Sequence, residues 1–92
     1  MQRITAKRLL DSVFQDLLRL EEEGRIKAGS ETERLYLKTH SESALTALQV
    51  ALGLPGPRPT VTVEWSQKDP EFLKVSMDEK TIEIFKLHGV LE

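Results

Sequence analysis

The chain has 92 residues, with 13 Lys plus Arg against 15 Asp plus Glu, so its net charge is -2. A balance this close to neutral does not favour nucleic acid or an anionic membrane as a partner through bulk electrostatics. Hydrophobic residues make up 39% and charged residues 30% of the chain, close to globular averages. We therefore expect a single small domain over residues 1–90, and we treat residues 91–92 as a possible cloning scar.

The chain contains no cysteine. This excludes a disulfide framework, a thiolate nucleophile and a thiolate metal site. No run of about 18 apolar residues is present, so we expect no helix that spans a membrane. The amino terminus, "MQRITAKRLLDSV", reaches an acidic residue too early for a signal peptide. We therefore expect a cytoplasmic protein that does not bind membranes.

The first predicted element is an amphipathic helix that begins after Thr5 and ends before Gly24. Threonine is a good N-cap, and glycine accepts the left-handed conformation that ends many helices. At about 100° per residue, the apolar side chains of this segment fall in one arc. They are Ala6, Leu9, Leu10, Val13, Leu17 and Leu20.

Two further apolar residues of this helix, Phe14 and Leu18, lie outside that arc. They widen the apolar surface to about half of the helix circumference, which exceeds the stripe that a single core requires. We expect Leu10, Val13 and Leu17 to cover the protein's own sheet. Phe14 and Leu18 are then the candidate interface, with the second helix or with another chain.

The middle of the chain predicts a hairpin and a second helix. In residues 25–39, the short segments "RIKA" and "RLYLKT" flank a polar stretch, a pattern typical of a β-hairpin. In residues 39–52, three leucines recur at helical spacing. Thr39 and Glu42 have the spacing of a capping box, and Gly53 is a natural end for the helix.

The last third of the chain predicts strands. The proline-rich segment "GLPGPRP", residues 53–59, can continue neither a helix nor a central strand. After it, "TVTVEW" and "FLKVSM" alternate between apolar and polar residues, which is typical of half-buried strands. In "TVTVEW", the apolar face carries Val61, Val63 and Trp65. With "TIEIFKL" as a third strand, the pattern predicts a three-stranded antiparallel meander.

A helix at the end of the chain is the alternative to the third strand. Ser76 and Glu79 have capping-box spacing, and Ile82 and Phe85 can share a helical face. The alternation of Ile82 and Ile84 favours the strand. The predicted fold is therefore α+β, with two helices packed on one face of an antiparallel sheet built mainly from residues 60–88.

The sequence shows no catalytic, metal or cofactor motif. His40 and His88 lie far apart, with no Cys and no second His at ligand spacing, so we expect surface or structural roles for both. The serines near His40 are explained by the predicted start of a helix. We expect no enzyme activity and no cofactor.

The only basic grouping large enough to consider for nucleic acid lies in the first third of the chain. It supplies the alternative nucleic-acid contacts Arg3, Lys7, Arg8 and Arg19. Acidic residues are interleaved with them, and this dilutes their attraction for phosphates.

The segment "LLRLEEEGRIKAGSETERLYLKT", residues 17–39, resembles the recognition helix and the following hairpin of winged-helix transcription regulators. This resemblance implies a DNA-binding accessory factor as the alternative function. The wing-like residues "GSETE" are acidic, whereas DNA-binding wings are usually basic, so the resemblance assigns a role to no individual residue.

The sequence thus favours a small, non-catalytic binding or regulatory protein that acts through protein–protein contacts. A homodimer is the expected assembly, because isologous pairing is the commonest way to bury an apolar surface that every copy carries.

Overall fold

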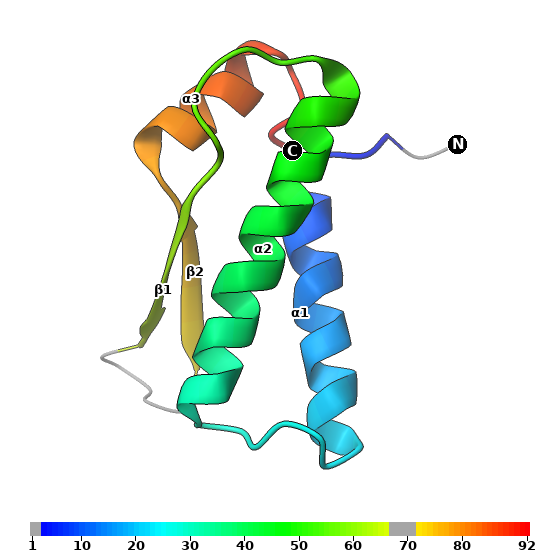
Figure 1. Ribbon diagram of the computed structural model, residues 1–92, viewed down its shortest axis with the longest axis vertical. Coiled ribbons are helices and arrows are strands. Elements are labelled where there is room, and N and C mark those ends of the chain that lie inside the picture. The colour runs from blue at the N-terminus through cyan, green and yellow to red at the C-terminus, as the bar shows by residue number, and fades with distance from the viewer. Residues whose placement is uncertain (1–2, 67–71) are drawn as a thin grey trace.

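A computed structural model describes residues 3–66 and 72–92 of the chain. The elements in this part are α1 (Ala6–Glu22), α2 (Glu31–Leu52), β1 (Val61–Trp65), β2 (Leu73–Met77) and α3 (Glu79–Leu87). Figure 1 shows α1 and α2 side by side, with the sheet flanking α2 and α3 closing one end. The fold is α+β, as predicted, but the predicted three-stranded meander is wrong, because the sheet in the described residues has two strands.

Helix α1 has the ends that the sequence predicts. The Thr5 hydroxyl accepts a hydrogen bond of 3.3 Å from the Arg8 amide and so caps the first turn. Gly24 has a φ of 72° in the left-handed region, which is where the chain leaves the helix. The buried residues of α1 are Ala6, Val13 and Leu17.

Helix α2 begins nine residues earlier than predicted, so the predicted hairpin over residues 25–39 is wrong. Ser30 is the N-cap, and its hydroxyl accepts a hydrogen bond of 3.2 Å from the Glu33 amide. Ser30 and Glu33 therefore have the capping-box spacing that we assigned to Thr39 and Glu42. The buried positions then continue along one helical face: Glu33, Leu37, Ser41, Leu45, Leu48 and Gln49.

Strands β1 and β2 confirm the two alternating segments. They pair antiparallel, with Val63 opposite Val75 at the centre of the register. The side chains of β1 that face the helices are buried at Val61 and Val63 and half-buried at Trp65, while their β2 counterparts are all half-buried. The sheet is therefore covered more completely on β1 than on β2.

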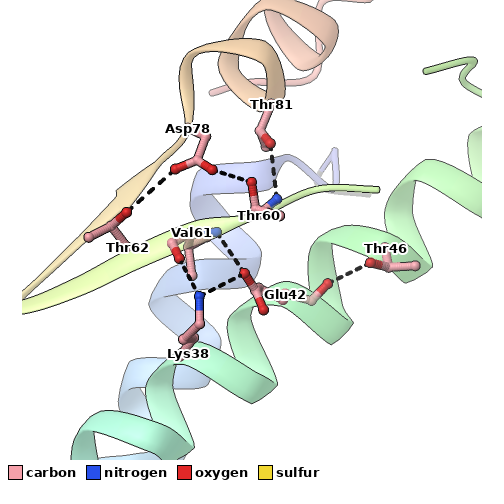
Figure 2. Close-up of polar contacts among 8 residues, drawn as sticks. All are labelled: Lys38, Glu42, Thr46, Thr60, Val61, Thr62, Asp78 and Thr81. Atoms are coloured by element: carbon pink, nitrogen blue, oxygen red, sulfur yellow. Dashed lines mark hydrogen bonds and ion pairs between the residues drawn. The ribbon is translucent and has the colours of Figure 1, made fainter. Parts of the chain in front are cut away.

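The segment after β2 forms helix α3, so the predicted third strand is wrong and the alternative helix is right in type. Its N-cap position is Asp78, two residues after Ser76, which the capping-box spacing indicates. Thr81 and Phe85 are buried one helical turn apart. The Thr81 hydroxyl accepts a hydrogen bond of 3.1 Å from the Thr60 amide, which ties α3 to the start of β1 (Figure 2).

The end of the chain packs against the start of α1. The Ala6 amide donates to the Val90 carbonyl at 2.8 Å, and the Lys7 amide donates to the Leu91 carbonyl at 3.0 Å. Amides of a first helical turn have no partner within the helix, so these two bonds satisfy them. Leu91 is half-buried against the core. The origin of residues 91–92 in cloning stays a prediction.

Among the described residues, no helix combines the length and the apolar character needed to cross a membrane.

Candidate functional site

An apolar hollow of the surface lies between α1 and β2. It has a volume of about 330 Å³ and is lined by Lys7, Leu10, Asp11, Phe14, Leu73, Val75 and Met77. The β2 residues in this group are the ones whose side chains point toward the helices.

A second hollow of about 160 Å³ continues the first, because Phe14 and Leu73 line both. It extends toward the last turns of α1 and the first turns of α2, and it includes Leu18 and Phe72. These two side chains are 39% and 61% exposed. We call the two hollows together the α1–β2 groove. Phe14, Leu18 and Phe72 in this groove stay in contact with water in the described structure, and a cluster of exposed side chains of this size often marks a binding surface.

The structure brings both residues of the candidate interface into this groove. Phe14 is half-buried on its wall, and Leu18 lies at its exposed end. The prediction that Leu10, Val13 and Leu17 together cover the sheet is wrong in part. Leu10 shares the hollow with β2 but is only half-buried, whereas Val13 and Leu17 are buried where α1 packs against α2. The reason is the position of α2, which packs against the face of α1 that carries Val13 and Leu17.

Sequence reasoning missed the β2 half of the groove. The alternation of Leu73, Val75 and Met77 predicts their common face correctly. It does not indicate that this face is only half covered. The missing information is the number of strands, because the predicted third strand would have paired with the free edge of β2.

The two edges of the sheet differ in their hydrogen bonding. The Asp78 amide donates to the Thr60 carbonyl at 3.1 Å, and the Ser66 amide donates to the Phe72 carbonyl at 2.8 Å. Bonded pairs alternate with non-bonded pairs in an antiparallel ladder, and the register is continuous between these two bonds. The non-bonded residues therefore point their amides and carbonyls away from the ladder: Val61, Val63, Trp65, Leu73, Val75 and Met77.

The outer edge of β1 is closed at Val61 by side chains of α2 (Figure 2). The Val61 amide donates to the Glu42 carboxylate at 2.9 Å, and the Val61 carbonyl accepts a hydrogen bond of 2.9 Å from Lys38. Lys38 also lies 3.2 Å from the same carboxylate. These contacts hold β1 against α2, and another chain has no access to Val61 in this conformation.

The outer edge of β2 carries no comparable contact. In the part of the chain that the structure describes, no hydrogen bond joins the outward backbone groups of Leu73, Val75 and Met77 to another element. An unpaired edge of this kind offers a row of donors and acceptors to an incoming strand. The free edge lies directly beside the α1–β2 groove, because the same three residues line both.

The basic residues considered for nucleic acid do not form one patch. Lys7 pairs with Glu92 at 2.6 Å near the start of α1, and Arg19 pairs with Asp16 at 3.1 Å near its end. With a rise of about 1.5 Å per residue, Lys7 and Arg19 are separated by roughly 18 Å along the helix. Arg3 and Arg8 lie at the Lys7 end and are exposed. The wing of the winged-helix resemblance is absent, because residues 31–39 belong to α2.

Two exposed ion pairs shift the pKa of their carboxylates. Arg34 donates hydrogen bonds to Glu31 and so lowers the pKa of Glu31, and Glu31 in return raises the pKa of Arg34. Lys7 donates to Glu92 and lowers the pKa of that carboxylate. The first pair lies within the first turn of α2, and the second joins α1 to the end of the chain. Both are exposed structural ion pairs, so neither indicates a catalytic group.

The histidines and carboxylates of the described residues do not form a metal site. No group of three or more potential ligands is present there. The His40 ring stacks on Tyr36 along the surface of α2, with the ring centroids 4.0 Å apart. The Asp78 carboxylate accepts hydrogen bonds from Thr60 and Thr62 at the junction of the sheet and α3 (Figure 2). These contacts give His40 and Asp78 structural roles.

Comparisons with protein families, with curated proteins and with solved structures gave no significant match.

Proposed function

We propose that this protein is a small, non-catalytic binding protein that acts through protein–protein contacts, and that the α1–β2 groove is its binding surface. The expected place of action is the cytoplasm, which the absence of cysteine from the sequence favours. The observation that carries the proposal is the exposure of large apolar side chains in one continuous hollow, with Leu18 and Phe72 at its open end.

Burial of this surface would be favourable. A large apolar side chain contributes about 1.5–3 kcal/mol when it passes from full exposure to full burial. Leu18 and Phe72 are partly exposed, while Phe14 and the β2 side chains are half-buried, so each has part of this free energy still to gain. A domain of this size has limited stability of its own, and a bound partner adds to it.

The homodimer expected from the sequence stays a proposal for the same surface. Two copies that pack α1 against α1 would cover Phe14 and Leu18 of both. The alternative of a DNA-binding accessory factor has less support, because Arg19 lies apart from Arg3, Lys7 and Arg8, and the described residues after α1 form a helix in place of the wing.

Capture of a partner from the native host with matched variants tests the proposal. Leu18→Glu puts a charge into the groove, and Leu87→Glu makes the same change at a residue that is 80% exposed on α3. We expect a stoichiometric protein partner to be retained by the wild type and by Leu87→Glu and to be lost by Leu18→Glu. Retention of that partner by Leu18→Glu and by a second groove variant, Phe72→Glu, would refute the proposed surface.

A further inference from the structure

The helices of this protein span a greater width than its sheet. Neighbouring helices pack about 8–10 Å apart, whereas neighbouring strands lie about 4.8 Å apart, so two helices span at least about three strands. The sheet in the described residues has two strands. Figure 1 shows both long helices on one side of this sheet, with α2 in contact with it and α1 beside α2. The α1–β2 groove is the space that results.

The free edge of β2 and the adjacent groove together can accommodate one additional strand. A strand added beside β2 would bond to the outward backbone groups of Leu73, Val75 and Met77. Residues directly opposite each other in a ladder point to the same face. Every second side chain of the added strand would therefore enter the groove toward Phe14 and Leu10, which line it from α1.

The sheet geometry argues against a second copy of this chain at this edge. Pairing of β2 with β2 across a two-fold axis puts the long helices of both copies on one face of a four-stranded sheet. Four helices need about 24–30 Å between the outer axes, while the outer strands of such a sheet are about 14 Å apart. The two α1 helices would collide. A bare extended segment has no such conflict.

The outer face of β2 adds a charge preference. Lys74 is exposed there, and within the described residues it makes no ion pair. Its neighbour on the β1 side is Glu64. On the open side, an acidic side chain of the added strand would lie beside Lys74, and opposite charges at neighbouring positions stabilise a sheet.

We infer that an extended segment of a partner protein binds as a third strand along the β2 edge. This segment has apolar residues at alternate positions, which fill the α1–β2 groove, and an acidic residue on the outer face beside Lys74. The inference rests on the proposed function and names its mode of recognition. Main-chain hydrogen bonds supply affinity in this mode, and the alternate side chains supply selectivity.

A synthetic peptide with the sequence of residues 59–66, "PTVTVEWS", is a suitable probe. This sequence already pairs with β2 on its other side, and it carries Val, Val and Trp at alternate positions with a Glu between two of them. In a titration followed by amide NMR, we expect shifts and slowed hydrogen exchange at Leu73, Val75 and Met77. A peptide that is N-methylated at its two Val residues loses two backbone hydrogen bonds. We expect it to bind at least about tenfold more weakly than the unmodified peptide.

Two proline variants give the matched control. Val75→Pro removes an amide that points away from β1, so it blocks the free edge and leaves the ladder bonds in place. Val63→Pro makes the same change in the residue opposite, on the edge of β1. Both variants are checked for folding by circular dichroism. We expect Val75→Pro to abolish peptide binding and Val63→Pro to retain it.

The outcomes separate this inference from the proposed function. Equal binding of the peptide by Val75→Pro and wild type, or no shift at the β2 amides, would overturn strand addition. If Val75→Pro keeps the captured partner that Leu18→Glu loses, the groove binds proteins in another mode and the proposed function stands. A dimer in sedimentation that Val75→Pro dissociates would show that the occupant is a second copy.

Discussion

The Glu42 carboxylate accepts a hydrogen bond of 2.9 Å from the Val61 amide, and this contact joins the middle of α2 to the first residue of β1. Lys38 completes the arrangement with a hydrogen bond to the Val61 carbonyl (Figure 2). The contact occupies the outer edge of β1 at Val61. The other edge, on β2, stays open beside the groove.

Removal of the Glu42 carboxylate should destabilise the fold. In Glu42→Ala the part-buried Val61 amide loses its acceptor and Lys38 loses its ion-pair partner, at a cost of about 1–3 kcal/mol. Urea denaturation measures this cost. Glu42→Gln keeps an acceptor oxygen and should retain most of the stability. Glu83→Ala, an exposed carboxylate on α3, is the control. Equal midpoints for Glu42→Ala and Glu83→Ala would show that the contact does not contribute.

Gly56 should tolerate a side chain poorly. Its φ is 122°, and a Cβ atom added there would lie 2.6 Å from the Ile84 side chain in α3. Gly56→Ala therefore puts a side chain at a φ that favours glycine and makes the terminal methyl of Ile84 move, and we expect a loss of about 2 kcal/mol, mainly from the backbone strain. Gly24 has a φ of 72°, close to the left-handed helical region, and open space around the Cβ position, so about 1 kcal/mol is expected for Gly24→Ala. A thermal midpoint for Gly56→Ala at or above that of Gly24→Ala would contradict this account.

The ion pair at the start of α2 should make stability depend on pH. Arg34 lowers the pKa of Glu31 from its ordinary value of 4.5, so the folded state binds the Glu31 proton less tightly than the unfolded state does. The resulting stabilisation is present above pH 4.5 and is lost as the pH falls through the lower, folded value. The stability difference between wild type and Glu31→Gln should therefore shrink on acidification. A difference that is constant from neutral pH to strong acid would refute the pairing in solution.

Self-association distinguishes the two occupants proposed for the groove. Strand addition predicts the 10.5 kDa monomer in sedimentation equilibrium at micromolar concentration when no partner is present, whereas the homodimer that packs α1 against α1 predicts a dimer. A dimer that Leu18→Asp dissociates and Leu87→Asp does not would establish the homodimer through Phe14 and Leu18 in place of strand addition.

Duplex DNA should bind weakly at physiological salt, no tighter than about 100 µM. Lys7 and Arg19 already have carboxylate partners, and they lie at opposite ends of α1. Fluorescence anisotropy over a salt series measures the affinity and its slope. Submicromolar binding that weakens steeply with salt and disappears in a variant with Arg3, Lys7 and Arg8 replaced by Ala would favour the DNA-binding alternative.

The sequence alone determined the elements whose signals are local. Helix α1 follows from its apolar period together with Thr5 and Gly24, because capping and amphipathicity act within a few residues. Strands β1 and β2 follow from their alternation. Phe14 and Leu18 also stand out locally, since they exceed the stripe that one core requires, and both lie in the groove.

Tertiary contacts decided the remaining elements. In the segment from Thr81 to Phe85, the alternation of Ile82 and Ile84 competes with helical spacing, and helix α3 wins because Thr81 bonds to Thr60 while Phe85 enters the core. Because this segment is a helix and not a third strand, the sheet is narrower than the two long helices that pack beside it. The groove and the free edge of β2 follow from that mismatch. Neither can be predicted from a local pattern, because the width of a layer depends on how many elements pack into it.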